Sequence, residues 1–389
     1  MAGPLAGKII LDMSRVLAGP SCAQSLADLG AEVIKIERPG AGDDTRGWGP
    51  PFLKDTEGRD TADAAYYLSA NRGKQSVLAD LASEKGQALI RALAARADVL
   101  IENFKVGQLA KYGLDYASIA KDNPKLVYCS VTGFGQTGPL AHRAGYDFVI
   151  QGMSGFMSIT GEADDQPGGG PQKAGVAISD LMTGMVSTQA ILAALLHVER
   201  GGDGQHIDMA LLDVMVSSLA NMNTNYLASG TAPHRWGNAH PNVVPYQTFQ
   251  TKDGWVIVAV GNNDQFRRFC EAGKQPEVSA DPRFASNALR IQNRAELIEL
   301  LRPMLRDQTS AYWIDLFEKA QVQARGLRVD LPREDAGVVK LVGNPIRFSG
   351  TPIEYTLAPP RLGEHTEKVL RDHLNFDDAQ IAEYMRSVS

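Results

Sequence analysis

The sequence predicts an α/β fold in which a large domain built on a parallel sheet accompanies a smaller α+β domain. Three observations lead to this prediction. The chain has 389 residues, and at roughly 150 residues per domain this length implies two or three hydrophobic cores. Short β-branched runs alternate with helix-like segments over the first third of the chain. Residues 227–244 are rich in Gly, Pro, Asn and His, a loop composition that separates two regions.

Strands and helices alternate regularly in the first region. Pro20 favours a helix that begins there, because proline suits the first helical turn. The expected strands are the β-branched runs at residues 8–11, 32–36, 98–101 and 126–131. The expected helices, with apolar residues at helical spacing, are 20–29 and 86–95. This alternation implies a parallel sheet with helices on its faces.

The remaining predicted elements divide between the two domains. Residues 205–219 indicate a strand leading into a helix, and residues 254–260 indicate a strand that is followed by helices between 264 and 320. One last amphipathic helix is expected at 366–374, in a tail too short to fold alone. The expected boundaries are 1–215 with 333–389 for the large domain, and 216–332 for the linkers and the small domain.

Composition excludes several classes of protein. The formal net charge is −6 and the Lys and Arg residues are dispersed, so nucleic acid is not an expected partner. Three cysteines without Cys-x-x-Cys spacing, and histidines without ligand spacing, argue against disulfides and a metal site. Residues 1–7 lack a signal-peptide pattern, and the most apolar internal run, 190–196, is far below the ~20 residues that span a bilayer. We therefore expect a cytoplasmic protein that binds no metal and no membrane.

The first strand-to-helix turn tests whether this architecture binds a dinucleotide. The turn, residues 12–20, contains only Gly19, whereas the dinucleotide fingerprint needs three glycines. Pro20 also removes a backbone amide donor that a phosphate would use. A nicotinamide-dependent enzyme is therefore not expected.

A series of motifs runs in order through nearly the whole chain. Each motif is weak alone, whereas their joint order is highly specific. The segments include Leu17-Ala18-Gly19-Pro20, Glu37-Arg38-Pro39-Gly40, Asn71-Arg72-Gly73-Lys74, Glu102-Asn103-Phe104, Gly145-Tyr146-Asp147, Asp180-Leu181-Met182-Thr183-Gly184 and Gly363-Glu364-His365-Thr366. On these residues the chain resembles the family III CoA-transferases of the CaiB/BaiF type.

The resemblance implies an interlocked homodimer in which a large Rossmann-like domain, formed by both chain ends, is joined by long linkers to a small domain. It also implies that acyl-CoA binds between the large domain of one subunit and the small domain of its partner. The substrates would be a coenzyme A thioester and a free carboxylic acid, with no cofactor bound permanently.

By the same resemblance, Asp180 is the covalent nucleophile. An aspartate with an ordinary pKa near 4 is ionised at neutral pH and needs no general base to attack a thioester. A position at a helix start would also favour the ionised form. The family's reaction proceeds through an aspartyl anhydride and an aspartyl-CoA thioester. The alternative is that Asp180 only caps a helix expected at 181–198.

The resemblance also assigns contacts to coenzyme A. Arg38 and Lys111, the latter with an Arg-to-Lys change, would supply positive charge to its phosphates. Phe104 or Tyr112 would flank the adenine. The expected contact residues are Val16, Arg38, Asn71, Lys74, Asn103, Phe104 and Lys111. The alternative for Arg38 and Lys74 is that they are solvated surface charges, as most such residues are.

Three positions narrow the reaction. Thr132 and Leu17 stand where the formyl-CoA transferase branch has lysine and glutamine, which argues against formate or oxalate as substrate. Tyr146 stands where the related α-methylacyl-CoA racemases have a histidine, and a phenol with a pKa near 10 is a poor α-proton base. Racemization remains the closest rival reaction, and a non-catalytic CoA-binding protein is the alternative from another class.

The acid substrate is expected to be a dicarboxylic acid, with succinyl-CoA as donor. A second carboxylate would pair with an arginine, for which Arg15, Arg72 and Arg143 are the candidates. Tyr146 either contacts the substrate or packs against the CoA channel. His240 either forms a local hydrogen bond or contacts the substrate carboxylate. The candidate oxyanion donors are the backbone or side-chain amides of Gly168, Gly169, Gly170, Gly237 and Asn238.

Overall fold

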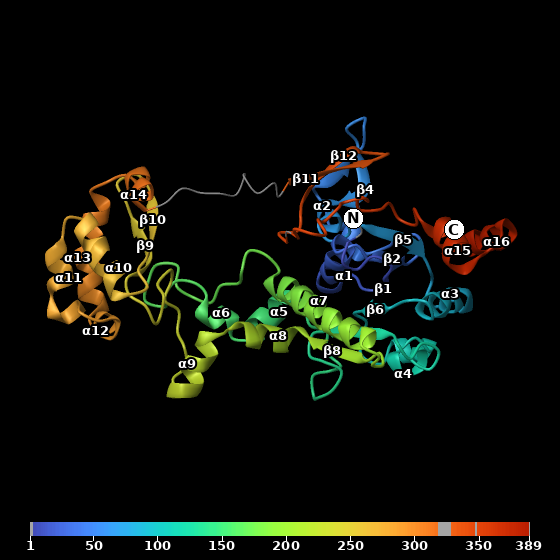
Figure 1. Cartoon of the computed structure of the whole chain (residues 1–389), viewed down its shortest axis with the longest axis horizontal. Helices are drawn as coiled ribbons and strands as arrows, with labels where there is room; N and C mark the ends of the chain where they lie inside the picture. Colours follow the sequence, from blue (N-terminus) through green and yellow to red (C-terminus); the bar gives the residue numbers. More distant parts are fainter. Residues whose placement is uncertain (1–2, 318–327, 347, 389) are drawn as a thin grey trace. The chain divides into compact units, whose positions relative to one another are not determined.

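The chain divides into two units in the computed structural model, which describes residues 3–317, 328–346 and 348–388 (Figure 1). Unit 1 consists of Met1–Phe156, Ala174–Asn223 and Gly326–Ser389. Unit 2 consists of Met157–Lys173 and Thr224–Arg325. The division differs from the expected boundaries chiefly because Met157–Lys173 belongs to unit 2.

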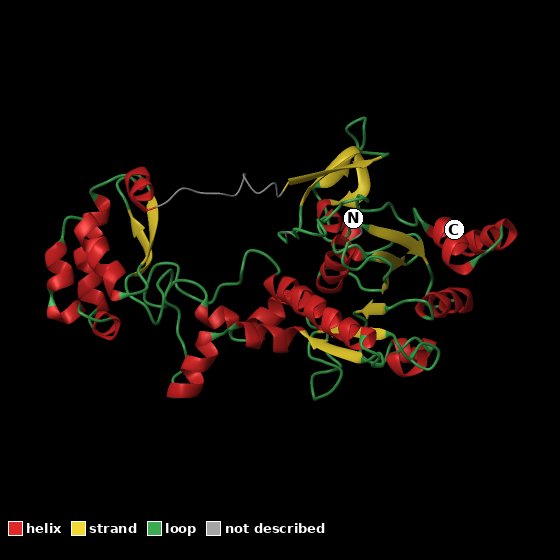
Figure 2. Cartoon of the chain, in the orientation of Figure 1, coloured by secondary structure: helices red, strands yellow, loops and turns green. Residues whose placement is uncertain are grey.

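A six-stranded parallel sheet lies at the centre of unit 1, in the order β5-β2-β1-β6-β7-β8 (Figure 2). The order reverses next to β1, which is the first strand in the chain. The strands are β1 (Ile9–Asp12), β2 (Glu32–Glu37), β5 (Lys74–Leu78), β6 (Val99–Glu102), β7 (Val127–Thr132) and β8 (His206–Ala210). The residues of β5, β2, β1, β6 and β7 are almost all buried, as parallel sheets covered on both faces require, whereas the edge strand β8 exposes His206 and Asp208.

One face of the sheet is covered by helices from distant parts of the chain. Leu89 and Leu93 of α3 pack with Val369 of α15 and Ile381 of α16 in one buried cluster, which also contains sheet residues such as Leu100. The helices are α3 (Glu84–Ala94), α15 (Thr366–Leu374) and α16 (Asp378–Val388). The C-terminal tail therefore completes the core that the N-terminal sheet begins (Figure 1).

The other face is covered by α1 (Ala18–Asp28), α7 (Ile178–Glu199) and α8 (Leu211–Ser218). Helix α7 is the one helix in the described part of the chain that is long and apolar enough to span a membrane, and 33% of its most apolar window is buried. Its residues Ile191 and Leu195 pack in the sheet core with Leu26 of α1.

Shorter elements complete unit 1. A buried ion-pair network ties its two ends together, because Asp63 pairs with both Arg46 and Arg333 at 2.5 Å. The elements are η1 (Asp44–Gly47), β3 (Phe52–Lys54), β4 (Asp60–Ala64), α2 (Ala65–Leu68), η2 (Leu109–Tyr112), α4 (Tyr116–Ile119), α5 (Asp147–Met153), β11 (Arg328–Arg333) and β12 (Gly337–Val342). Helices α6 (Phe156–Ile159) and α9 (Asn221–Ser229) extend across the unit boundaries.

Unit 2 packs an antiparallel hairpin, β9 (Tyr246–Gln250) with β10 (Trp255–Ala259), against helices. Phe249 and Val258 of the hairpin are buried with Leu301 and Trp313 in one cluster. The helical elements are α10 (Asn263–Ala272), α11 (Pro276–Ala280), η3 (Pro282–Phe284), α12 (Asn287–Gln292), α13 (Arg294–Arg306) and α14 (Ser310–Phe317).

The structure confirms the predicted α/β class and the parallel sheet. Strand β5 was not predicted, because its residues Lys74, Gln75 and Ser76 are polar although buried. Helix α1 begins at Ala18, so Pro20 is its third residue and not its first. A second C-terminal helix, α16, follows the one expected at 366–374.

Candidate active site

The site lies where the N-termini of α1 and α7 meet the loop that follows β1. A cavity of about 250 Å³ opens there, on the carboxyl-end side of the sheet. The predicted site residues that line it are Arg15, Val16, Asn103, Phe104, Tyr146 and Asp180. Leu17, Asp44, Arg143 and Asp147 line it as well. One cavity thus brings together half of the site residues that the motifs indicated.

Asp180 is the third residue of α7, whose N-cap is Ala177. It is therefore not the N-cap residue that the capping alternative required. No hydrogen bond or ion pair joins its carboxylate to any residue that the structure describes. A carboxylate without such partners, at a cavity wall, is available to a ligand.

The ionisation of Asp180 differs from the expectation. Burial, and then the neighbouring Asp147 carboxylate, raise the pKa of Asp180 to about 7. The expectation of a fully ionised aspartate was therefore wrong, because desolvation and a like charge outweigh the favourable field of the helix N-terminus. A pKa near the working pH is typical of catalytic carboxyl groups.

Asp147 is held rigidly beside Asp180. Its Oδ1 accepts hydrogen bonds from the Ser179 amide at 2.9 Å and the Ser179 hydroxyl at 2.7 Å. Its Oδ2 accepts a hydrogen bond from Gln151 at 2.7 Å. These three hydrogen bonds fix the position of the Asp147 carboxylate, whose charge acts on Asp180. The sequence motif contained Asp147 but did not indicate this role.

A close helix crossing places Asp180 at this point. A Cβ atom on Gly184 would lie 2.9 Å from the carbonyl oxygen of Ala18 and would overlap Ser21 Oγ. Only glycine therefore lets α7 approach α1 this closely without a shift of the backbone. The N-terminal turns of both helices are thereby brought to the same cavity.

The loop between β1 and α1 has a strained and well-fixed backbone. Val16 has φ of +73°, which is unfavourable for a β-branched residue. Its amide donates to Asp43 at 3.3 Å. The preceding Arg15 exchanges two hydrogen bonds with Asn103, from its amide at 3.0 Å and to its carbonyl at 2.7 Å. These contacts fix Val16 and Asn103 at the cavity wall.

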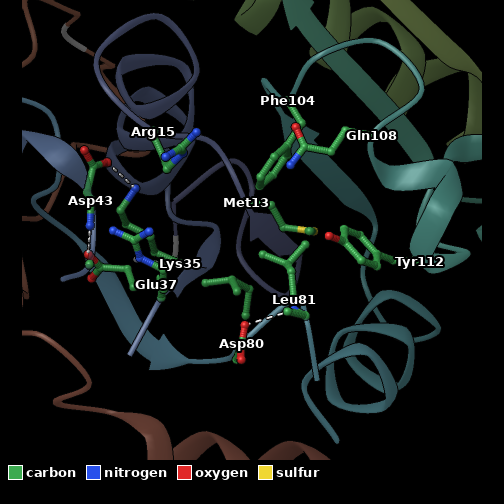
Figure 3. Close-up of a pocket in the computed structure, with 14 residues that line it drawn as sticks. Met13, Arg15, Lys35, Glu37, Asp43, Asp80, Leu81, Phe104, Gln108 and Tyr112 are labelled. Atoms are coloured by element: carbon green, nitrogen blue, oxygen red, sulfur yellow. Dashed lines mark hydrogen bonds and ion pairs between the residues drawn. The ribbon is translucent and has the colours of Figure 1, made fainter. Parts of the chain in front are cut away.

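A second cavity, of about 300 Å³, shares Arg15, Phe104 and Gln108 with the first (Figure 3). Figure 3 shows aromatic and apolar side chains, including Phe104 and Tyr112, on one side and ionisable side chains on the other. Arg38 also lines this cavity, whereas Lys111 is exposed and lines neither. The arrangement suits a ligand with a flat ring and anionic groups.

Asn71 and Lys74 line neither cavity, and both are fully buried. The Lys74 ammonium donates to Asp12 at 2.8 Å, to the Pro20 carbonyl at 2.9 Å and to Asn71 at 3.0 Å, so its three protons are used. Burial lowers its pKa to about 8. The alternative in which Lys74 is a solvated surface charge was wrong. Its hydrogen bonds join β5 to β1 and α1 in the interior, at a residue for which a contact with coenzyme A was expected.

Arg72 also lies away from the Asp180 cavity. Arg72 is buried and forms a bidentate pair with Asp28, at 2.8 and 2.5 Å. Its third contact is the Val342 carbonyl at 2.9 Å. His240 belongs to unit 2. Among the three arginine candidates, the cavity therefore brings Arg15 and Arg143 to Asp180, and not Arg72.

Tyr66 and Trp48 are neighbours of the site that no motif indicated. Burial, followed by the charges of Asp180, Asp147 and Asp43, raises the pKa of the Tyr66 phenol. The Trp48 ring lies edge-on to Tyr66 with centroids 5.2 Å apart. No spacing rule links these residues to Asp180, so the sequence carried no signal for them.

Comparison with known proteins defines the class. The family model for CoA-transferase family III matches residues 5–366, and the chain belongs to this family. It is 52% identical over 386 residues to a succinate–glutarate CoA-transferase of Agrobacterium fabrum, which covers 95% of each chain. It is 41% identical to the succinyl-CoA:glutarate CoA-transferase of Mus musculus, over 99% of this chain and 89% of the mouse protein.

A solved structure also resembles this chain. The CAIB/BAIF family protein from Brucella suis is 45% identical, with a TM-score of 0.81. The match covers 96% of this chain and 100% of that protein. The protein is thus a family III CoA-transferase with the fold of that family. In the described residues no cluster of three His, Cys, Asp or Glu side chains has the geometry of a metal site.

Proposed function

We propose that this enzyme transfers coenzyme A from succinyl-CoA to a dicarboxylic acid through covalent intermediates on Asp180. The observation that carries the proposal is the unpartnered Asp180 carboxylate at the wall of a cavity. The substrates are supported by the names of the relatives from A. fabrum and mouse, which pair succinate with glutarate.

The reaction begins when an Asp180 oxygen attacks the thioester carbonyl of succinyl-CoA. The C–S bond breaks, coenzyme A leaves as a thiolate, and a succinyl–aspartyl anhydride remains. The thiolate then attacks the aspartyl carbonyl, which releases succinate and forms an aspartyl-CoA thioester. The two leaving groups, the coenzyme A thiolate and the succinate carboxylate, each depart as an anion, so neither step consumes a proton.

The second half runs in reverse with the new acid. Its carboxylate attacks the aspartyl-CoA carbonyl, which expels the thiolate and forms a new anhydride. The thiolate attacks the acid's own carbonyl, which yields the new acyl-CoA and restores the Asp180 carboxylate. Because each intermediate is activated, water must be kept from the cavity while it exists.

The pKa of Asp180 gives this scheme a pH dependence. Only the ionised carboxylate is a nucleophile, and a desolvated carboxylate is more reactive than a hydrated one. With a pKa of about 7, the active form of the free enzyme accumulates as the pH rises through neutrality. A carboxylate with this pKa needs no separate general base to attack the thioester.

The coenzyme is proposed to extend from the Asp180 cavity into the cavity that Figure 3 shows. Phe104 and Tyr112 supply aromatic surface for the adenine, and Arg38 and Arg15 supply charge for phosphate groups. Val16 and Asn103 would line the passage between them. Lys111 lies on the exposed surface of η2 and its contact with a phosphate remains a prediction.

Intact-protein mass spectrometry tests the nucleophile. The wild type incubated with succinyl-CoA should gain a coenzyme A or succinyl adduct that glutarate discharges, and Asp180→Ala should gain none. Asp203→Ala, which removes an exposed surface carboxylate paired with Lys125, is the matched control and should behave as the wild type. An adduct of equal yield on Asp180→Ala would contradict the mechanism.

Two expectations stay proposals. The interlocked homodimer implied by the family predicts twice the chain mass by light scattering. The racemase alternative predicts exchange of the acyl α-proton with deuterated water, and here Tyr146 occupies the position of the required base. Exchange without CoA transfer would favour that alternative.

A further inference from the structure

Residues 103–108 of unit 1, which we call the Phe104 segment, lie between several cavities. Phe104 lines the Asp180 cavity, the cavity of Figure 3 and a third cavity of about 240 Å³. Lys105 and Val106 line both the Asp180 cavity and the third one. Much of the segment therefore borders open space instead of packed side chains. Its position depends on the few hydrogen bonds that hold it.

Few backbone hydrogen bonds hold the Phe104 segment. The amides of residues 105–107 have no hydrogen bond to any residue that the structure describes. The Gln108 amide donates to the Lys105 carbonyl at 2.9 Å, which closes a turn within the segment. The Phe104 amide donates to Oε2 of Glu102 at 2.8 Å. This last bond joins the backbone of the segment to a side chain of the central sheet.

Glu102 is well placed to fix that amide. It is the last residue of β6 and is 5% exposed. Its partner in register on β7 is Ser130, whose Oγ lies 2.9 Å from Nε2 of His206. The Ser130 hydroxyl lowers the pKa of Glu102, but burial, the larger cause, raises it.

The charge of Glu102 does not stabilise the fold. No cation forms an ion pair with its carboxylate within the described ranges of the chain. A buried carboxylate without a cation is unfavourable for stability. A glutamate at this position is therefore better explained by the amide that it holds than by the stability of the sheet.

We propose that Glu102 is a positioning residue, whose carboxylate oxygen holds the Phe104 amide so that the Phe104 ring is presented to coenzyme A. The inference rests on the proposed function, in which Phe104 supplies aromatic surface for the adenine. Asn103, the residue between them, fixes the turn at Arg15 through two hydrogen bonds of its own. Consecutive residues of one motif thus hold two different walls of the coenzyme site, which lowers the cost of ordering them on binding.

Calorimetric titration with free coenzyme A tests the inference without turnover. Glu102→Leu removes the acceptor oxygen, and its Kd for coenzyme A should rise about tenfold. Glu102→Gln keeps an acceptor oxygen at the same distance from the backbone, and its Kd should stay within twofold of the wild type. Because the pKa of Glu102 is raised in the folded protein, the stability that its proton gives is lost as the pH rises. Glu102→Gln should therefore unfold at no lower urea concentration than the wild type at pH 8.

Steady-state kinetics separate positioning from a general loss of structure. In Glu102→Leu the KM for succinyl-CoA should rise about tenfold, whereas the KM for glutarate and kcat should change less than twofold. Glu102→Gln should restore the KM for succinyl-CoA. Equal losses for both substrates would overturn the proposal, as would a defect of Glu102→Gln as large as that of Glu102→Leu.

A double-mutant cycle tests whether Glu102 acts through Phe104. Phe104→Ala alone should raise the KM for succinyl-CoA, since it removes the ring. Adding Glu102→Leu to Phe104→Ala should raise that KM less than twofold further, because the residue being positioned is already absent. A further tenfold rise would show that Glu102 acts independently of Phe104 and would overturn the positioning role.

Glu32→Leu is the matched control. Glu32 is the first residue of β2 in the same sheet, accepts a hydrogen bond from Gln75 at 2.7 Å and lines neither coenzyme cavity. Its removal should leave the Kd for coenzyme A and both KM values unchanged. A loss equal to that of Glu102→Leu would show a general effect of removing a carboxylate from the sheet and would overturn the proposal.

Hydrogen exchange reports on the held amide directly. Exchange of the Phe104 amide should be at least fivefold faster in Glu102→Leu and unchanged in Glu102→Gln. An unchanged Kd for coenzyme A in Glu102→Leu overturns the proposal, whatever the exchange rate. If the wild type transfers no CoA but binds coenzyme A, the proposed function fails, and the Kd comparison still decides the role of Glu102. A wild type that does not bind coenzyme A overturns both. If Glu102→Leu does not fold, Glu102→Asp, which withdraws the carboxylate by one methylene, carries the same comparisons.

Discussion

Units 1 and 2 each contain charges without an oppositely charged partner among the described residues, and these charges have opposite signs in the two units. In unit 1, Asp180 lacks a cation and lies beside a second carboxylate, Asp147. In unit 2, Arg290 and Arg294 lack an acid within the described residues. Both arrangements are unfavourable for folding, which is typical of sites whose partner is a ligand.

The buried charges of unit 1 that do have partners show the contrast. Lys74 with Asp12, Arg72 with Asp28 and Arg46 with Glu37 are pairs at 2.5 to 2.8 Å that join separate elements. All three involve motif residues, yet their hydrogen bonds are made within the protein. Motif residues therefore include both candidate ligand-binding residues and residues that stabilise the fold. A charged motif residue without an ion-pair partner in the protein is the better candidate for ligand binding.

The largest expected effect comes from breaking a paired charge. Asp12→Ala removes the carboxylate from Lys74, which then keeps a buried ammonium without an acid within bonding distance. We expect a loss of roughly 3–5 kcal/mol in the free energy of unfolding, measured by urea denaturation. The double variant Asp12→Leu, Lys74→Met should recover part of it. A loss below about 1 kcal/mol in the single variant would mean that the pair does not stabilise the fold.

Removing the Asp180 carboxylate, by contrast, should increase the free energy of unfolding. The pKa of Asp180 is raised in the folded state, so the folded protein binds the proton more tightly and loses stability as the pH rises from about 4 to 7. Asp180→Asn should therefore increase the free energy of unfolding at pH 8 by on the order of 2–4 kcal/mol. The difference in the free energy of unfolding should vanish near pH 3, where Asp180 of the wild type is protonated in both the folded and the unfolded state. If Asp180→Asn were less stable than the wild type at pH 8, the ionised Asp180 carboxylate would not be unfavourable for folding.

Asp147→Asn should move the pH profile. Without the neighbouring charge the pKa of Asp180 falls toward its ordinary range, although burial, the larger cause, still holds it up. The rising limb of kcat/KM should shift to lower pH, and the turnover at pH 6 should increase relative to that at pH 8. A shift to higher pH would show that Asp147 does not act through its charge.

The smallest predicted effect is on substrate choice. Arg143 lines the Asp180 cavity, lies 5.8 Å from the centroid of Phe134, and has no ion pair within the described residues. Arg143→Ala should lower kcat/KM for glutarate about tenfold more than for butyrate, a difference of roughly 1.4 kcal/mol. Arg15→Ala should do less, because Arg15 already pairs with Asp44 at 2.9 Å. Equal losses for both acids would remove Arg143 from carboxylate recognition.

Much of the fold was predictable because its signals are local. The strands at β1, β2, β6 and β7 are β-branched runs, and each was placed within one residue of its observed bounds. Strand β5 escaped because its burial depends on partners far away, such as Asp12 for Lys74 and Glu37 for Ser76. A polar residue looks exposed until the structure supplies its hydrogen-bond partner.

Half of the predicted site residues line one cavity, and their roles stay predictions. Asp180, Asn103 and Val16 were found through motifs, whereas Tyr66 belongs to the site only because α2 lies beside it. The expectation for Asp180 itself failed on electrostatics, since burial and the distance between two carboxylates are properties of packing.

The sequence alone determined the parallel α/β architecture and the family, because these depend on periodicity and on residues in a fixed order, and it predicts Asp180 as the nucleophile. The tertiary structure decided which charged residues are neutralised within the protein and which remain for a ligand. Lys74 and Asp180 are both charged motif residues, and only the positions of Asp12 and Asp147 in space give one a stabilising partner and the other a repelling neighbour. The physical reason is that the energy of a buried charge depends on the few groups within about 4–6 Å of it, and folding chooses those groups from the whole chain.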